Sequence, residues 1–291
     1  MNQKTRGYLY ALISTIIVAS GYVSNYVLLQ RLTPAGAAFA VYGLSALVAA
    51  ATWLAWRKKH EVAIIRKHGK QLLVFGVLNS VGTLLWFQTL SIIGPALAGF
   101  LFRFVTIFAI AMGILFLKER FNAGEAVGML LIVAGAGVIT YTDFSLAGGA
   151  VLAIVASFCF AAVGLVAKKW LGGVSALSLN SVRIVLMFII IAAYAASQGA
   201  AALPPVELAP YVIGSAFVIV VGLLIYYESI RLTELSKVAT VGALEPMFVL
   251  LFSLALLAKV PTNVQLLGGL VIMAGLAVLL RYRKKPVLHA E

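Results

Sequence analysis

The hydrophobic and polar positions of this chain alternate in long blocks. Apolar runs occupy residues 7–30, 35–56, 71–93, 95–117, 124–141, 147–169, 175–198, 208–230, 236–257 and 263–280. A helix needs about 20 predominantly apolar residues to cross the hydrocarbon core of a bilayer, and each run is close to that length. Most connections are short, so consecutive helices must run antiparallel. We therefore predict an all-α membrane protein with ten transmembrane helices.

Composition excludes a soluble domain. Hydrophobic residues make up 63% of the 291 residues, charged residues 11%, and the mean hydropathy is +1.08. The net charge of +13 would suit a nucleic-acid partner, but the basic residues lie in short clusters between apolar runs. Such clusters orient membrane helices and meet anionic lipid headgroups. We expect a lipid bilayer as partner and no nucleic acid.

The basic residues are distributed unequally between the two sides of the membrane. If loops are assigned alternately to the two sides, 18 of the 22 Lys and Arg residues fall on one side. Only Arg31 and Lys259 fall on the other, and Arg103 and Arg183 lie within spans. Basic residues are retained on the cytoplasmic side. This bias predicts an even number of spans in a multi-pass protein of the plasma or inner membrane, with both termini cytoplasmic.

The chain contains an internal repeat. The segment that starts at Trp86 aligns without gaps on the segment that starts at Tyr226, so that Gly128 meets Gly268 and Gly135 meets Gly275. Close helix packing explains these glycines better than a ligand does. Each half holds five spans, an odd number, so the second half must enter the membrane from the opposite face. We predict two inverted five-helix repeats, residues 1–143 and 144–291, with a binding site between them near mid-membrane.

Two short motifs in these halves resemble a known family. They are the step Leu244-Glu245-Pro246 and the turn Leu117-Lys118-Glu119-Arg120 that precedes Gly128. With the five-helix halves, they are similar to the drug/metabolite transporter superfamily, and in particular to its EamA-type exporters. The family usually has a Glu-Pro step and an acidic turn residue in each half. In this chain Val105-Thr106 stands at the position of the Glu-Pro step of the first half, and Lys259 at that of the acidic turn residue of the second half. The resemblance implies a ten-helix carrier that exports small metabolites, most often amino acids and related compounds.

Glu245 and Pro246 lie near the centre of the apolar stretch 235–257. A carboxylate at that depth costs roughly 2.5–3.5 kcal/mol, so it should face protein or water. Pro246 has no backbone N–H, which leaves a carbonyl about one turn earlier without its helical partner. A charge beside a helix break at mid-membrane is typical of a transport site. The alternative is a kinked packing helix in which a neighbour neutralises Glu245.

Two arginines also lie within the spans. Arg103 is two residues before the position aligned with Glu245, and its guanidinium cannot shed its charge. It is either an anchor for an anionic group of a substrate or a structural partner of Glu245 or a snorkelling side chain. Arg183 lies closer to the cytoplasmic end, where we expect it to snorkel. Glu228, near the same interface, is expected to pair with Arg231.

Polar and aromatic residues of two helices are candidates for the wall of the site. Asn79 and Trp86 are seven residues apart and share nearly one helix face, as Tyr22 and Asn25 do at a separation of three. Together they offer hydrogen bonds and aromatic surface to an organic substrate. Aromatic residues near span ends also form interfacial belts, which is the competing interpretation for Trp86 and Tyr26.

An enzymatic function is not expected. The histidines His60, His68 and His289 and the single aspartate, Asp143, all fall in predicted loops or the tail. They supply no catalytic pair or metal site within the membrane, and no phosphate-binding glycine loop indicates ATP as the energy source. We expect no cofactor and no metal.

The main hypothesis is a secondary transporter that alternates access by rocking its two halves, as a monomer or homodimer. Protons are a candidate coupling ion, although a Glu245 permanently paired with Arg103 would not titrate usefully. Two alternatives stay open. One is an exchanger of anionic phosphorylated metabolites, which needs several intramembrane cations. The other is a non-transporting membrane scaffold or receptor, which would not need Glu245 and Arg103 at depth.

Overall fold

The computed structural model describes residues 3–56, 59–117, 122–141, 144–170, 174–232, 238, 241–258 and 261–282. Every regular element within these ranges is helical. Eight helical segments found there are long and apolar enough to cross a membrane, one of them the run Val206–Leu232 that joins several shorter helical elements, and the shorter apolar helix Glu245–Leu257 adds to them. The prediction of an all-α membrane protein is confirmed. The count of ten crossing segments stays a prediction.

The described part of the first half contains six helices. They are α1 (Gln3–Leu29), α2 (Pro34–Trp56), α3 (Lys59–Lys67), α4 (Gly69–Leu101), α5 (Phe104–Leu117) and α6 (Ala123–Tyr141). The sequence did not predict α3, because nine residues are too few for a span. The expected span 95–117 is divided between α4 and α5. Helix α4 also includes the expected span 71–93 and bends at Gly94, just before Pro95. Gly94 has a φ of 74°, which glycine adopts readily and other residues do not.

The second half repeats this order with further breaks. It contains η1 (Phe144–Leu146), α7 (Ala147–Trp170), α8 (Ala176–Ser197), η2 (Val206–Leu208), α9 (Ala209–Phe217), the π-helical segment η3 (Val218–Gly222), α10 (Leu223–Leu232), α12 (Glu245–Leu257) and α13 (Asn263–Tyr282). Within the expected span 236–257, helix α12 begins only at Glu245. Its residues 236, 237, 239 and 240 lie outside the described part of the chain.

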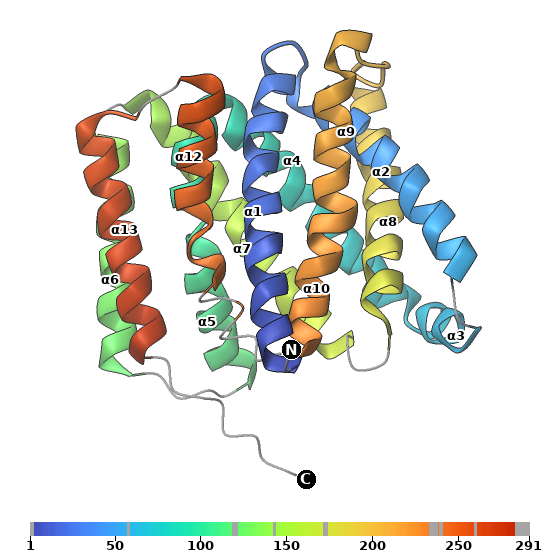
Figure 1. Cartoon of the computed structure of the whole chain (residues 1–291), viewed down its shortest axis with the longest axis horizontal. Helices are drawn as coiled ribbons and strands as arrows, with labels where there is room; N and C mark the ends of the chain where they lie inside the picture. Colours follow the sequence, from blue (N-terminus) through green and yellow to red (C-terminus); the bar gives the residue numbers. More distant parts are fainter. Residues whose placement is uncertain are drawn as a thin grey trace.

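The equivalent helices α6 and α13 of the two halves run antiparallel. Helices α6 and α13 pack along their length at one edge of the bundle (Figure 1), with Gly128 against Gly275 and Gly135 against Gly268. A Cβ on Gly135 would lie 2.6 Å from the carbonyl oxygen of Gly268. Contacts that pair an early residue of one helix with a late residue of the other require opposite directions. The glycines thus serve close helix packing, as predicted, and the second half is inverted relative to the first.

Other contacts between the halves occur in matching pairs. Helix α4 packs on α7 as α10 packs on α1. A Cβ on Gly82 would lie 3.0 Å from Cβ of Cys159, and one on Gly222 would lie 2.8 Å from Cγ2 of Ile17. Gly82 and Gly222 are 140 residues apart, which is the offset of the internal repeat, and Ile17 and Cys159 are 142 apart, so the two contacts are equivalent in the two halves. Helix α1 begins and α13 ends at the same end of the bundle (Figure 1). The exact boundary at residue 143 stays a prediction.

Two buried clusters of apolar side chains lie side by side within the bundle. The central cluster joins α1, α4, α7 and α12 and includes Tyr22, Phe102 and Val249. The lateral cluster joins α2 and α8 with the region of η3 and includes Tyr42 and Met187. Trp86 of α4 packs against both clusters. The charged group around Glu245, described next, is embedded in the central cluster.

Candidate functional site

Glu245 is the first residue of α12. It follows a turn at Ala243 and Leu244, and Pro246 occupies the first turn of the helix, a position where proline is common. The positive end of the helix dipole at this position stabilises a carboxylate. The Glu245 side chain is 16% exposed. It therefore faces the protein and not the lipid.

One carboxylate oxygen of Glu245 joins three parts of the chain. Oε1 accepts a hydrogen bond from Nη2 of Arg103 at 2.9 Å and another from the hydroxyl of Tyr22 at 2.9 Å. Tyr22 lies on α1, and Arg103 lies in the short turn between α4 and α5. Arg103 is 13% exposed, so it does not snorkel. The structural pairing of Arg103 with Glu245, one of the predicted alternatives, is present.

Arg103 also bonds the backbone carbonyl that Pro246 leaves without a helical donor. In an unbroken helix the N–H of residue 246 would bond to the carbonyl of residue 242, and proline has no N–H. Nη1 of Arg103 donates to that oxygen, on Gly242, at 3.2 Å. The freed carbonyl predicted from Pro246 is thus found and has a partner. Nε of Arg103 is buried and has no hydrogen-bond partner within the described ranges.

Aromatic rings cover this charged group. The rings of Tyr22 and Trp86 meet edge to face with centroids 5.2 Å apart, and Phe102 lies 6.5 Å from Tyr22 and 6.3 Å from Trp86. Trp86 also packs edge to face on Phe87 at 5.1 Å. The alternative that Trp86 and Tyr26 belong to an interfacial belt is wrong, because Trp86 packs inside the bundle and Tyr26 is 7% exposed.

The two predicted asparagines bond to their own helices. Nδ2 of Asn25 donates to the carbonyl of Gly21, and its buried Oδ1 has no partner in the described part of the chain. Nδ2 of Asn79 donates to the carbonyl of Phe75 at 3.1 Å. Asn25 is one helical turn from Tyr22, whereas Asn79 is two turns from Trp86. The structure therefore brings Tyr22, Trp86, Arg103 and Glu245 together and shows no contact of Asn79 with them.

One member of the site, Phe102, was not predicted, and Gly242 was expected only as an unnamed free carbonyl about one turn before Pro246. Phe102 adjoins Arg103 at the break between α4 and α5, a break that hydropathy does not reveal because the flanking residues are all apolar. Gly242 contributes through its backbone, so no side-chain pattern could mark it. Counting four residues back from Pro246 would have found it.

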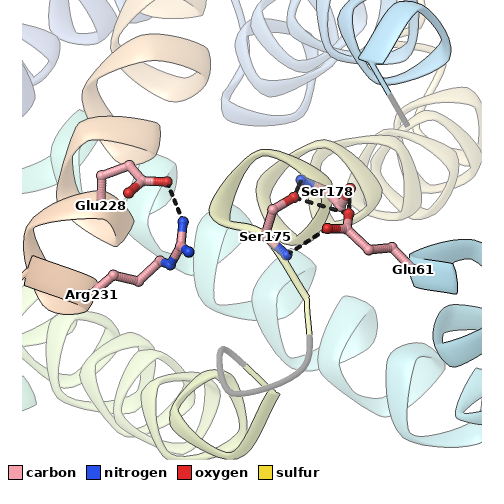
Figure 2. A network of polar contacts seen from close by, with 5 residues as sticks. All are labelled: Glu61, Ser175, Ser178, Glu228 and Arg231. Atoms are coloured by element: carbon pink, nitrogen blue, oxygen red, sulfur yellow. Dashed lines mark hydrogen bonds and ion pairs between the residues drawn. The ribbon is translucent and has the colours of Figure 1, made fainter. Parts of the chain in front are cut away.

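Two polar groups lie outside this site. Glu228 and Arg231 form the predicted ion pair at 2.8 Å (Figure 2), and both are substantially exposed. Figure 2 also shows Glu61 of α3, which accepts hydrogen bonds from the Ser175 hydroxyl at 3.0 Å and from the Ser178 hydroxyl. Ser175 caps the N-terminus of α8. Glu61 was missed because it belongs to the unpredicted helix α3.

Arg183 does not reach the interface as predicted. It is 4% exposed and buried in the lateral cluster, where Nη2 donates to Oδ1 of Asn180 at 2.9 Å. Snorkelling would leave the guanidinium in water, so this prediction is wrong. The position of Arg183 near the end of the predicted span suggested that its side chain could reach water, but α2 and α4 pack against α8.

Comparison with known proteins assigns the chain. The model of the EamA-like transporter family matches it twice, over residues 5–141 and 147–281. The chain belongs to the EamA-like transporter family. The resemblance carried by the Glu245-Pro246 step is therefore confirmed, and this EamA-like protein is an integral, multi-pass membrane transporter.

Solved structures agree on the fold of this EamA-like transporter. Eighteen chains of known structure match it. One, described only as "Crystal structure of protein", superposes with a TM-score of 0.67 over 93% of this chain and 96% of its own. At 14% identity, that likeness shows the fold alone. No curated protein sequence matches.

Proposed function

We propose that this EamA-like transporter is a secondary carrier that exports small organic metabolites, namely amino acids and related amphipathic compounds. The observation that carries the proposal is the shared oxygen of Glu245. Tyr22 and Arg103, from the first half, both donate to this carboxylate of the second half. Rocking of one half against the other must change these bonds. This arrangement supports a charged group that alternating access would open and close.

The charges of the pair favour a substrate that carries both signs. Separating Arg103 from Glu245 leaves two uncompensated charges in a mostly apolar bundle, which costs several kcal/mol. A zwitterion can replace each partner, its ammonium group meeting Glu245 and its carboxylate meeting Arg103. Substrate binding would then exchange one set of ion pairs for another. A purely anionic substrate would leave Glu245 unpaired, which is why the exchanger of phosphorylated metabolites has less support.

The other residues of the site, including Phe102, are assigned roles in the same proposal. The rings of Tyr22, Trp86 and Phe102 would receive the apolar part of an amphipathic substrate. Asn25 has a buried, unused acceptor one turn from Tyr22 and would bind an ammonium group. Asn79 would line the route further along α4. Protonation of Glu245 would also break the pair, which makes protons the coupling ion to test first.

The location of the protein follows from the distribution of its basic residues. We place both termini on the cytoplasmic side of the plasma or inner membrane. The oligomeric state in this proposal is a monomer or homodimer, since the cluster described above is complete within one chain.

Flux into proteoliposomes tests this function. Purified protein would be reconstituted and challenged with a panel of amino acids and amphipathic drugs, with and without a pH gradient, beside protein-free liposomes. The proposal predicts saturable flux of at least one zwitterionic compound. Saturable flux of phosphorylated anions alone would support the exchanger, and absence of flux across the whole panel would support a non-transporting scaffold.

A further inference from the structure

A second buried charge lies apart from the Glu245 group. Arg183 is in the second turn of α8, about 10 Å along the helix from its start at Ala176. It is 4% exposed, and the lateral cluster surrounds it. A guanidinium remains charged in any protein environment, so this site carries a full positive charge within the bundle.

No carboxylate neutralises that charge within the described ranges. The two ion pairs found there join Arg103 to Glu245 and Arg231 to Glu228. The buried acids Glu61 and Glu125 accept hydrogen bonds from hydroxyl and backbone groups at the ends of α8 and α6. Burial of an ion without a counter-charge costs several kcal/mol. Among the described residues the Arg183 guanidinium thus has no anionic partner, and an anion bound from outside the chain would supply one.

The donors of Arg183 are only partly used. Nη2 donates to Oδ1 of Asn180, Nη1 contacts the weak acceptor Sδ of Met187 at 3.5 Å, and buried Nε has no partner among the described residues. The Tyr42 hydroxyl lies beside Arg183 and 3.4 Å from Oγ1 of Thr83. Polar groups of α2, α4 and α8 thus gather around the guanidinium, and no carboxylate among the described residues joins them.

The π-helical segment η3 fixes this arrangement. A π-turn displaces the regular backbone hydrogen bonds of a helix and is frequent at functional sites. Nδ2 of Asn180 donates to the carbonyls of Ile219 and Val220 in η3, at 3.3 and 3.1 Å. Its Oδ1 is therefore turned toward Arg183, which orients the guanidinium. Asn180 thus links Arg183 on α8 to the backbone of η3.

We propose that Arg183 forms a second ligand site, which binds a small carboxylate anion. The planar guanidinium matches a carboxylate with two parallel hydrogen bonds, and the hydroxyls of Tyr42 and Thr83 supply further polar contacts. This site is separate from the Glu245 group. Thr83 and Trp86 lie one turn apart on α4 and link the two. The inference stands on the geometry of Arg183 and does not depend on transport of a zwitterion.

Binding of acetate to the purified full-length protein tests the site. The dissociation constant is obtained from the rise in melting temperature with acetate concentration at constant chloride and ionic strength, beside acetamide as the neutral counterpart. We expect acetate, and not acetamide, to stabilise the wild type. In Arg183→Gln the affinity should fall about tenfold or more, because two charge-assisted hydrogen bonds are lost. The exposed Arg231→Gln should bind as the wild type does.

A second variant covers the case in which Arg183→Gln does not fold. Arg183→Lys keeps the charge but loses the planar pair of donors, so its affinity for acetate should also fall. The proposal is overturned if acetate does not stabilise the wild type more than acetamide does, or if the affinity is unchanged in whichever Arg183 variant folds. The second outcome would place the anion elsewhere, for example at Arg103. Neither outcome bears on the flux assay of the proposed function.

Discussion

Nη1 of Arg103 donates to the carbonyl oxygen of Gly242 at 3.2 Å, and Gly242 lies four residues before Pro246. Arg103 itself lies where α4 ends and α5 begins. The helix break of the first half is therefore bonded directly to the helix break of the second. A single guanidinium stabilises an orphan carbonyl and the Glu245 carboxylate together, which ties two broken helices at the centre of the bundle.

Pro246→Ala should separate stability from transport. Alanine restores a backbone N–H that can bond to the carbonyl of Gly242, so the helix can continue through the break. This N–H would compete with Arg103 for that carbonyl. We expect a melting temperature no lower than that of the wild type, with flux reduced about tenfold, a change that corresponds to about 1.4 kcal/mol in the barrier. Pro34→Ala, at the start of α2, is the matched control. Wild-type flux in Pro246→Ala would show that the break is not needed.

The Arg103–Glu245 pair should be strongly coupled in stability. Arg103→Gln or Glu245→Gln alone leaves a partly buried charge without its partner, which costs toward the lower end of roughly 3–5 kcal/mol. The double variant should lose about 1–3 kcal/mol less than the sum of the two. Unfolding of the purified proteins in detergent measures all four members of the cycle. Strict additivity would mean that the 2.9 Å contact contributes no coupling.

Tyr22→Phe should remove one hydrogen bond and little else. The ring that packs on Trp86 is kept, whereas the donor to Glu245 is lost. A hydrogen bond to a charged group contributes roughly 1.5–3 kcal/mol, so unfolding should become easier by about that amount. Tyr194→Phe, on the exposed end of α8, should have little effect on thermal unfolding. Equal effects of the two substitutions would argue against a bond at Glu245.

Glycine substitutions on α6 should differ by position. A Cβ on Gly135 would meet the carbonyl of Gly268 at 2.6 Å, whereas a Cβ on Gly137 has no neighbour within 4 Å. Gly135→Ala should therefore destabilise the protein by about 1–3 kcal/mol, as overpacking does. Gly137→Ala should be neutral or stabilising by up to about 1 kcal/mol, because alanine favours the helix. Melting temperatures of the two variants decide this, and similar losses in both would contradict the packing of α6 on α13.

Glu61→Gln should loosen the start of α8. The carboxylate accepts from Ser175 and Ser178 at the helix N-terminus, where a negative charge is favourable (Figure 2). Glutamine keeps the shape but loses the charge, so stability should fall by about 1–3 kcal/mol. Glu228→Gln removes a carboxylate from a more exposed ion pair and should cost less than about 1 kcal/mol. A larger loss in Glu228→Gln than in Glu61→Gln would reverse this ranking.

The sequence predicted those features that depend on the hydropathy of a segment, on its alignment with the other half or on the hydrogen-bonding groups of a residue. Apolar runs located the helices, the alignment of the halves placed Arg103 next to Glu245, and the missing N–H of Pro246 predicted the free carbonyl. Arg183 was misjudged for a different reason. In a bilayer, both the lipid-facing and the protein-facing sides of a helix are apolar, so hydropathy does not show which side packs inward. The depth of a residue along a span can be counted from the sequence. The helices that pack over its side chain cannot be identified in this way.

Local breaks were equally hard to predict. Helix α5 begins at Phe104 after a turn whose flanking residues are all apolar apart from Arg103, so no polar segment marks it. The nine residues of α3 were too short for a span. The π-helical segment η3 lies in an uninterrupted run of valine, isoleucine and glycine. These features depend on tertiary contacts, such as those of Asn180 with η3, and not on local composition.

Substrate flux through Glu245→Gln tests the central claim most directly. Wild type, Glu245→Gln and the control Glu228→Gln would be reconstituted in equal amounts and compared with a compound that the wild type transports. If the pair that Glu245 forms with Arg103 and Tyr22 lies in the transport site, flux should fall about tenfold or more in Glu245→Gln and stay near the wild-type rate in Glu228→Gln. Wild-type flux in folded Glu245→Gln would contradict the account.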